Sequence, residues 1–394
     1  MVAVSFTNLA VLLPIARASR PLSNGVFLAC KNVALFRQNV FLNPVQSGFE
    51  PVPLSLPLLL QQQKRSYSCC HHGAVRSSIA TTEAADHAAF VKDIAGVEPP
   101  SSLQCLLDVL QVKGERISSP YNRKGILPLV VPLSENREGE LTALLRWPTP
   151  SADMDMPVVR VRSYGVQLLA KSSEEYIHRA LVEEDTTTSS SSGSEEYPLA
   201  SRTGEFGSSL YRKGDYAASQ MASVDVYLMK KVGLFPDVFE RLAMRHLERG
   251  DEVSALVTGE FYANKKHFPG FGRPLVFNAE LLLRIGRKAE AREAARIALK
   301  SPWWTLGSSY SEVAAVAGWG DEQIEFMRER VTEQGRQEDL LKGKTPAQVA
   351  VDQAAFLLDL AATNGSWDDV RGQLATFYKE AGLEEMSRFV ATVD

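Results

Sequence analysis

The chain has 394 residues, of which 43 are Lys or Arg and 47 are Asp or Glu, so its formal net charge is −4 at pH 7. The first 80 residues hold seven basic residues and one acid, which leaves about −10 for the body that follows. An acidic body argues against non-specific nucleic-acid binding, because that affinity depends mainly on Lys and Arg side chains that contact phosphates. Three of the four cysteines also lie in the first 80 residues, so only Cys105 remains and the body can form no internal disulfide.

Residues 1–80 have the composition of an organelle transit peptide, because they are basic, hydroxylated and almost free of acid. A disordered basic tail is the alternative. A secretory signal fits poorly, since the apolar run from Leu9 to Ile15 is short and contains Pro14. The apolar stretch at 53–60 is shorter than the roughly 20 residues that a membrane span needs, so we expect no integral membrane segment. Composition favours a plastid slightly over a mitochondrion but does not separate the two.

A small α+β domain is predicted over 88–185. Apolar residues at helical spacing indicate a helix at Leu103–Val112. Two apolar runs separated by a turn cluster predict a β-hairpin, and a Val–Arg alternation predicts a third strand before a second helix. We expect one face of this sheet to be exposed to solvent. The predicted ranges are 126–133 and 140–147 for the hairpin, 157–162 for the third strand and 166–182 for the second helix.

Three arginines lie on the predicted strands, at Arg146, Arg160 and Arg162. They could bind an anionic metabolite, which would make this domain an enzyme, but an exposed strand face explains them as well. No carboxylate beside them is indicated as a catalytic group by the sequence.

A polar, low-complexity tract at 186–200 predicts a linker, since it has too few apolar side chains to bury a core. Over 201–394 a glycine then recurs between an apolar run and a more polar one, at steps of 36, 36, 34 and 45 residues. Such a period is typical of stacked helical hairpins. The sequence therefore predicts a mainly α fold, in which a tetratricopeptide-like helical-hairpin solenoid follows the small α+β domain. Ordinary antiparallel helices with glycine caps are the alternative. The recurring glycines are Gly214, Gly250, Gly286, Gly320 and Gly365.

No catalytic, cofactor-binding or metal-ligating set emerges, and we expect a protein that is not an enzyme. The tetrad at 342–345 resembles the end of a phosphate loop, but Glu338 stands where the upstream glycine is required. His178, His246 and His267 are scattered, without a second ligand at metal spacing.

A partner-binding site is expected instead at the ends of the best-formed hairpin, 275–303. Tryptophan and arginine are favoured at interface hot spots, although aromatic side chains that seal one hairpin against the next explain the same pattern. The candidate partner-binding residues are Phe268, Phe271, Arg273, Trp303 and Trp304.

Five sequence strings, taken in order, carry a resemblance to a known family. They are Tyr-Arg-Lys-Gly-Asp-Tyr at 211–216, His-Phe-Pro-Gly-Phe-Gly-Arg-Pro at 267–274, Glu-Ala-Arg-Glu-Ala-Ala-Arg at 290–296, Ala-Leu-Lys-Ser-Pro-Trp-Trp at 298–304 and Asp-Glu-Gln-Ile-Glu-Phe at 321–326. Together they resemble the plant and algal family of chloroplast ATPase biogenesis proteins, for which an older label is cyclin delta-like. The resemblance extends from about Asp93 onward, and no single string is diagnostic. The cyclin label has no support, because we find no cyclin box.

This resemblance implies a non-enzymatic assembly factor in the chloroplast stroma, which helps to incorporate the γ subunit into the catalytic head of the ATP synthase. It implies a protein partner, the γ subunit or another head subunit, no cofactor and no catalytic residues. A helical-repeat groove that accepts a partner helix is compatible with that role. The alternative suggested by the repeat period is an organellar RNA-binding helical-repeat protein, and the charge of the body counts against it.

Overall fold

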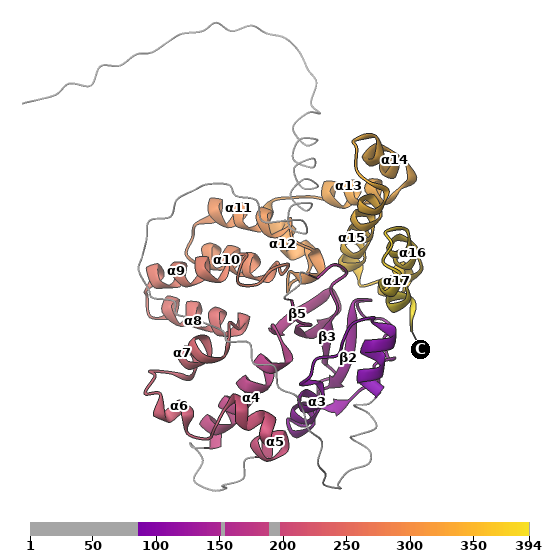
Figure 1. Cartoon of the computed structure of the whole chain (residues 1–394). Helices are drawn as coiled ribbons and strands as arrows, with labels where there is room; N and C mark the ends of the chain where they lie inside the picture. The colour runs from indigo at the N-terminus through magenta and orange to yellow at the C-terminus, as the bar shows by residue number, and fades with distance from the viewer. Residues whose placement is uncertain (1–85, 151–153, 189–197, 394) are drawn as a thin grey trace, which may run out of the picture.

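The computed structural model describes residues 86–150, 154–188 and 198–393, and the transit peptide predicted over 1–80 lies outside these ranges. Figure 1 shows helices that curve away from a small sheet and return to it. The fold is mainly α with an antiparallel sheet in its N-terminal part, as the sequence predicts. No helix in the described ranges is long and apolar enough to cross a membrane.

The sheet is a five-stranded antiparallel meander in the order β1-β2-β3-β4-β5. The predicted hairpin is present as β2 and β3, in which Val130 pairs with Leu145. The register shifts between Pro132 and Ser134, where proline cannot donate a ladder hydrogen bond. The strands are β1 (Arg116–Ile117), β2 (Val130–Glu135), β3 (Leu141–Leu145), β4 (Val158–Arg162) and β5 (Gly165–Ala170).

Two details predicted for this region are wrong. The segment expected to begin a helix at Val166 is strand β5, which pairs with β4 through a tight turn, and the helix begins only at Ser173. The sheet also lacks the expected solvent-exposed face at its centre, because Val130–Ser134 and Thr142–Leu145 are buried without alternation. Helix α3 packs on β2, and η3 and α8, from later in the chain, pack on β5.

The helices of the N-terminal part pack on one another and on the first helix after the predicted linker. Helix α3 contacts both α4 and α5. Because α4 ends at Thr188 and α5 begins at Pro198, both ends of the tract predicted as a linker are helical, and 189–197 lie outside the described residues. The helical elements here are η1 (Phe90–Ile94), α3 (Leu103–Val112), α4 (Ser173–Thr188), α5 (Pro198–Leu210), α6 (Asp215–Ala218), α7 (Val224–Tyr227) and η2 (Leu228–Val232).

Helical hairpins form at three of the five recurring glycines. Gly250, Gly286 and Gly365 adopt φ angles of 76°, 89° and 72°, and the helices on either side of each glycine pack together. The pattern fails elsewhere: the helix after Gly214 has a single turn, and α13 packs on α15. The remaining elements are α8 (Pro236–Glu248), α9 (Glu252–Tyr262), α10 (Arg273–Arg284), α11 (Lys288–Ala298), η3 (Trp303–Thr305), α12 (Tyr310–Ala317), α13 (Glu322–Val331), α14 (Glu333–Leu341), α15 (Pro346–Asn364), α16 (Trp367–Glu380) and α17 (Glu384–Ala391).

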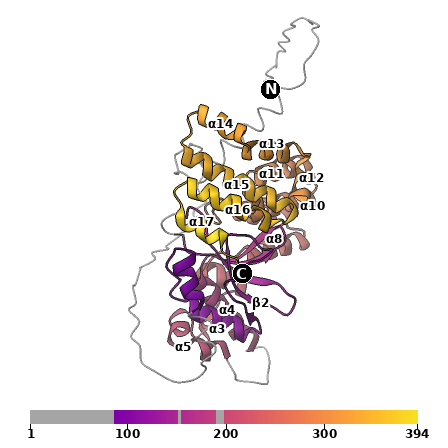
Figure 2. The ribbon, with the colours of Figure 1, turned by 90° about the vertical axis from the view of Figure 1, so that its right-hand side faces the viewer.

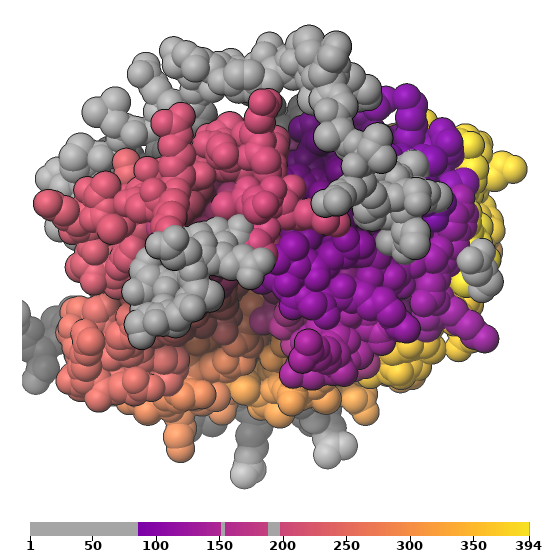
Figure 3. Space-filling view, turned by 90° about the horizontal axis from the view of Figure 1, so that it is seen from below, coloured from indigo at the N-terminus to yellow at the C-terminus, as the bar shows by residue number. Residues whose placement is uncertain are grey.

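The last two helices close the chain onto its N-terminal part. Figure 2 shows α16 and α17 beside the N-terminal elements, and Figure 3 shows the yellow C-terminal surface in contact with the indigo one. Arg123 is fully buried and donates to the main-chain carbonyls of Phe389 and Thr392, with its guanidinium 4.0 Å from the centre of the Phe389 ring. Burial, reinforced by the charge of Arg371, lowers the pKa of Arg123 to about 9.

Candidate protein-binding surface

The five predicted partner-binding residues gather at one junction, formed by the loop before α10 and by η3. Four of them lie inside the protein: Phe268, Phe271, Trp303 and Trp304 are 2%, 9%, 2% and 3% exposed. Direct contact with a partner requires exposed side chains, so in this structure these aromatic residues contribute to the interior. Their role in binding stays a prediction.

The aromatic junction receives a tryptophan from the N-terminal sheet. Trp147, just after β3, packs edge-on against Phe271 with ring centres 5.5 Å apart, and lies 5.1 Å from the ring of Trp304. Gly270 allows this approach, because a Cβ atom there would lie 2.9 Å from the Trp147 ring. The group that fills the predicted site is therefore a side chain of the same protein.

Arg273 is engaged within the chain by two carboxylates. Its Nε and Nη2 donate to the two carboxylate oxygens of Glu240, both at 2.8 Å, and its Nη1 donates to Glu280 at 2.8 Å. Burial alone would lower the pKa of Arg273, but the hydrogen bonds and charges of Glu240 and Glu280 outweigh burial and raise it. The guanidinium is thus charged and already paired in a bidentate geometry.

The turn between β4 and β5 occupies the inner side of the curve of helices, where Figure 1 shows β5. The Tyr164 hydroxyl donates to the carbonyl of Gly307 at 3.0 Å, and the Trp367 indole N–H donates to the carbonyl of Ser163 at 3.0 Å. Gly165 lies so close to η3 that a Cβ atom would be 2.0 Å from the Trp304 carbonyl oxygen. A helix that approaches this inner side would meet the protein's own sheet.

The strand arginines also have partners within the chain. Arg160 and Arg162 both form ion pairs with Glu140, the first at 3.2 Å. The hydrogen bond from Arg162, helped by the charge of Arg160, holds the pKa of Glu140 below its usual range. Arg146 is buried and donates to the carbonyls of Ala95 and Trp147. These arginines therefore stabilise the sheet and its surroundings.

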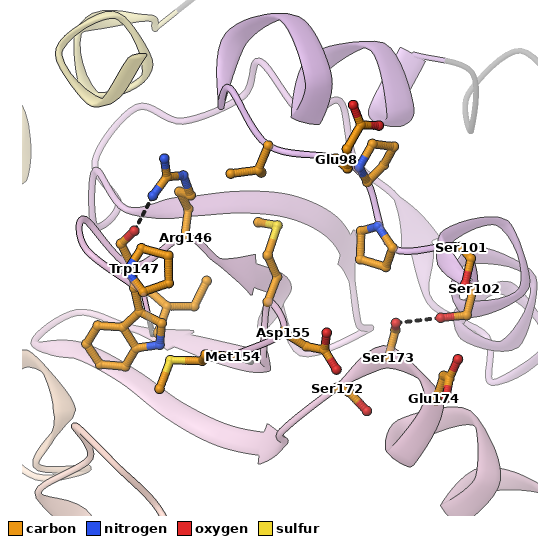
Figure 4. Close-up of a pocket in the computed structure, with 16 residues that line it drawn as sticks. Glu98, Ser101, Ser102, Arg146, Trp147, Met154, Asp155, Ser172, Ser173 and Glu174 are labelled. Atoms are coloured by element: carbon orange, nitrogen blue, oxygen red, sulfur yellow. Dashed lines mark hydrogen bonds between the residues drawn. The ribbon is translucent and has the colours of Figure 1, made fainter. Parts of the chain in front are cut away.

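A cavity of about 290 Å³ lies between the end of β3, the loop before α3 and the start of α4. Figure 4 shows its lining, in which the hydroxyls of Ser102 and Ser173 are 2.5 Å apart and hydrogen-bonded to each other. The lining contains no histidine or cysteine, so no serine there has an imidazole base beside it. The described part of the chain also holds no cluster of three or more metal-ligating side chains. This geometry supports no catalytic or metal assignment.

The one cysteine of the body has no reactive setting either. Cys105 is a buried free thiol on α3. Burial, with a smaller effect from Asp108, raises the pKa of this thiol to about 12. It is therefore protonated at neutral pH and a poor nucleophile.

A different surface, missed by the sequence analysis, does face outward. Helix α9 exposes three large apolar side chains, Val253 at 73%, Val257 at 61% and Phe261 at 46%. They lie at i, i+4 and i+8, so they form a single row about 12 Å long on one helix face. We call this row the α9 stripe. The other large apolar side chains that are exposed in the described ranges are Leu283, Ile297 and Leu341, on three other helices or their ends.

The orientation of α9 is fixed by its opposite face. Ala255, Gly259 and Tyr262 are buried, and a Cβ atom at Gly259 would lie 2.7 Å from the Leu281 side chain of α10. Tyr262 stacks on Phe239 with ring centres 5.6 Å apart. Small residues toward α10 and large apolar residues toward solvent are the signal that the sequence offered for this surface.

These features define a mainly α-helical protein, closed around a small antiparallel sheet, with an apolar helix face on its outside. Three models of one family match it in order: PAB N-terminal over 85–231, PAB middle domain over 236–320 and PAB C-terminal domain over 324–392. The chain belongs to the PAB family. The boundaries between these family models, at 232–235 and 321–323, lie within residues 201–394, for which the glycine pattern predicts one solenoid.

A curated relative agrees with this membership. The Arabidopsis thaliana protein named Protein IN CHLOROPLAST ATPASE BIOGENESIS, chloroplastic, is 51% identical over 340 residues, which cover 86% of this chain and 97% of that protein. No solved structure matches the chain.

Proposed function

We propose that this protein is a non-enzymatic assembly factor for the chloroplast ATP synthase, which acts in the stroma and helps to incorporate the γ subunit into the catalytic head. The observation that carries the proposal is the 51% identity to a protein named for chloroplast ATPase biogenesis, extending over 97% of that protein. Similarity over nearly the whole length favours a shared role over a shared module. The acid-poor composition of residues 1–80 is compatible with import into the chloroplast.

The structure supports a role in protein binding. The hairpins α8–α9, α10–α11 and α15–α16 are compatible with degenerate tetratricopeptide-like units, a repeat that presents helix faces to partners. The α9 stripe is an apolar surface of the kind that marks protein interaction sites. We propose that the buried aromatic junction of Phe268, Phe271, Trp303 and Trp304 serves binding indirectly, because it holds the hairpins against the sheet.

The proposal is tested by affinity capture from chloroplast stroma with the tagged full chain as bait, read by quantitative mass spectrometry. We expect the γ subunit or other head subunits to be enriched over unrelated stromal proteins. Buffers of low and high salt separate this role from RNA binding, since phosphate contacts weaken steeply with salt. Salt-sensitive recovery of RNA, with no ATP synthase subunit above background, would contradict the proposal.

A further inference from the structure

Polar and charged residues lie on both sides of the α9 stripe. On an α-helix, residues three apart are surface neighbours, so the row next to the stripe on one side consists of Glu252, the partly buried Leu256 and Glu260. Both carboxylates are exposed, and within the described part of the chain neither forms an ion pair or a hydrogen bond. The row on the other side holds the neutral Ser254 and Thr258. The surface is therefore an apolar row with an acidic edge and a neutral edge.

We propose that the α9 stripe is the docking site for an amphipathic helix of the assembly client, with apolar residues on one face and Lys or Arg along one edge. This inference rests on the proposed function for the existence of the client. A helix whose apolar residues recur at i, i+3, i+4 and i+7 matches a straight apolar row of about 12 Å, which is roughly two helical turns. Cations along one edge of that helix would face Glu252 and Glu260.

The same charges disfavour a second copy of this chain as the occupant. If two copies of α9 packed antiparallel about a two-fold axis, the same edge of each helix would meet, and four carboxylates would face one another. A parallel two-fold pairing would place Glu252 and Glu260 opposite Ser254 and Thr258, with no cation. Like charges juxtaposed across an interface are unfavourable, so a partner with a basic edge fits this surface better than α9 itself.

The test uses the full chain and two designed 20-residue amphipathic helical peptides that share one leucine face. One peptide carries Lys along one edge of that face and the other carries Glu there. We expect the Lys peptide to bind about tenfold more tightly than the Glu peptide, and Glu252→Lys combined with Glu260→Lys to reverse this preference. Val257→Glu places a charge in the middle of the apolar row and should weaken binding of the Lys peptide by tenfold or more, about 1.4 kcal/mol.

The matched control is Leu341→Glu, which adds the same charge at an apolar side chain that is 87% exposed on α14. It should leave peptide binding unchanged. Equal binding by the wild type and Val257→Glu, or no difference between the two peptides, would overturn the proposal. If the wild type sediments as a dimer and Val257→Glu sediments as a monomer, the occupant of the row is a second copy and the proposal is overturned. The proposal is also overturned if the wild type binds neither peptide.

Capture of the purified γ subunit by the same variants separates this inference from the proposed function. Loss of capture in Val257→Glu but not in Leu341→Glu would support both. If both variants capture the γ subunit as well as the wild type, the function stands and the α9 docking site falls. If the peptides bind as expected but no ATP synthase subunit is captured, the docking site stands and the function falls.

Discussion

The guanidinium of Arg371, on α16, donates a hydrogen bond to the main-chain carbonyl of Arg123, a residue 248 positions earlier in the chain. Arg123 in turn donates to the carbonyls of Phe389 and Thr392, at the C-terminal end of α17. Asp368 completes the connection, since it pairs with Arg371 and accepts from the Gly125 N–H at 2.9 Å. This buried contact joins the C-terminal helices to the N-terminal sheet.

Loss of the Arg123 side chain should destabilise the whole protein. Arg123→Met leaves the carbonyls of Pro128, Val130, Phe389 and Thr392 without their donor. Buried groups without a partner are costly, so we expect unfolding free energy to fall by about 3 kcal/mol or more. Urea denaturation followed by circular dichroism measures the change. Arg388→Met, at an exposed position on α17, is the control and should shift stability by less than about 0.5 kcal/mol; equal effects of the two substitutions would refute the assignment.

Trp147 should matter for stability because it fills the aromatic junction. Trp147→Ala removes a side chain that is 5% exposed and packed on Phe271 and Trp304, so we expect a loss of about 3–5 kcal/mol. Thermal unfolding gives the measurement, and Trp319→Ala, at a half-buried position, should have a clearly smaller effect. If Trp147→Ala left stability unchanged but abolished client binding, the junction would be a contact site and its interior role would be wrong.

Two glycines with opposite expectations test the close approach of the β4–β5 turn to η3. Gly165 has a φ of 147° and no room for a Cβ beside the Trp304 carbonyl, so Gly165→Ala should destabilise by about 2 kcal/mol or more. Gly372 lies within α16, and a Cβ there would meet nothing within 4 Å. Gly372→Ala should therefore stabilise by about 0.5–1 kcal/mol. Chemical denaturation gives the free energy of unfolding of both variants. If Gly165→Ala left that free energy unchanged, the β4–β5 turn would not be packed tightly against η3.

The ion pairs of Glu140 predict a pH-dependent contribution to stability. The hydrogen bond from Arg162 lowers the pKa of Glu140 in the folded state below the ordinary value of 4.5. A lowered carboxyl pKa contributes stability that is present above pH 4.5 and is lost as the pH falls through the folded-state pKa. Glu140→Gln should therefore reduce stability by about 1 kcal/mol at pH 7, and the difference from the wild type should shrink below pH 4.5.

Urea denaturation at several pH values follows this difference. The control is Glu138→Gln at an exposed neighbour, which removes a carboxylate while leaving the ion pairs of Glu140 with Arg160 and Arg162 in place. The ion pairs with Arg160 and Arg162 stabilise the ionised carboxylate of Glu140. If the stability difference between Glu140→Gln and the wild type increased as the pH fell, this assignment would be contradicted.

The local periodicities of the sequence were sufficient for much of the fold. The hairpin strands near Val130 and Leu141 follow from two apolar runs around a turn cluster, and the strand near Val158 follows from its Val–Arg alternation. The helix at Leu103–Val112 follows from helical spacing. Strand β5 was predicted as helix, although the Arg162-Ser-Tyr-Gly165 turn between two apolar runs is a hairpin signal. Regular repeats were expected from the glycine spacing, but the lengths of the helices between glycines vary too much for that spacing to fix their packing.

The candidate surface was harder to predict for a physical reason. Aromatic residues are favoured both at interfaces and in interiors. Composition therefore could not show whether Trp304 contacts a partner protein or packs on Trp147 of the same chain. Arg160 and Arg162 likewise find Glu140 only once β3 and β4 pair. The sequence indicates the α9 stripe only through the contrast between its large apolar residues and the small Ala255 and Gly259 on the opposite face. Either face by itself would also be typical of a buried helix.

The proposed role in assembly of the chloroplast ATP synthase can be tested in Arabidopsis plants that lack the 51% identical relative. The amount of assembled ATP synthase is measured in these plants with and without expression of this chain. We predict that this chain restores the assembled enzyme relative to the photosystems, and that the protein carrying Val257→Glu restores less of it than the one carrying Leu341→Glu. Folded protein that accumulates in the chloroplast while assembled ATP synthase stays unchanged would contradict the claim.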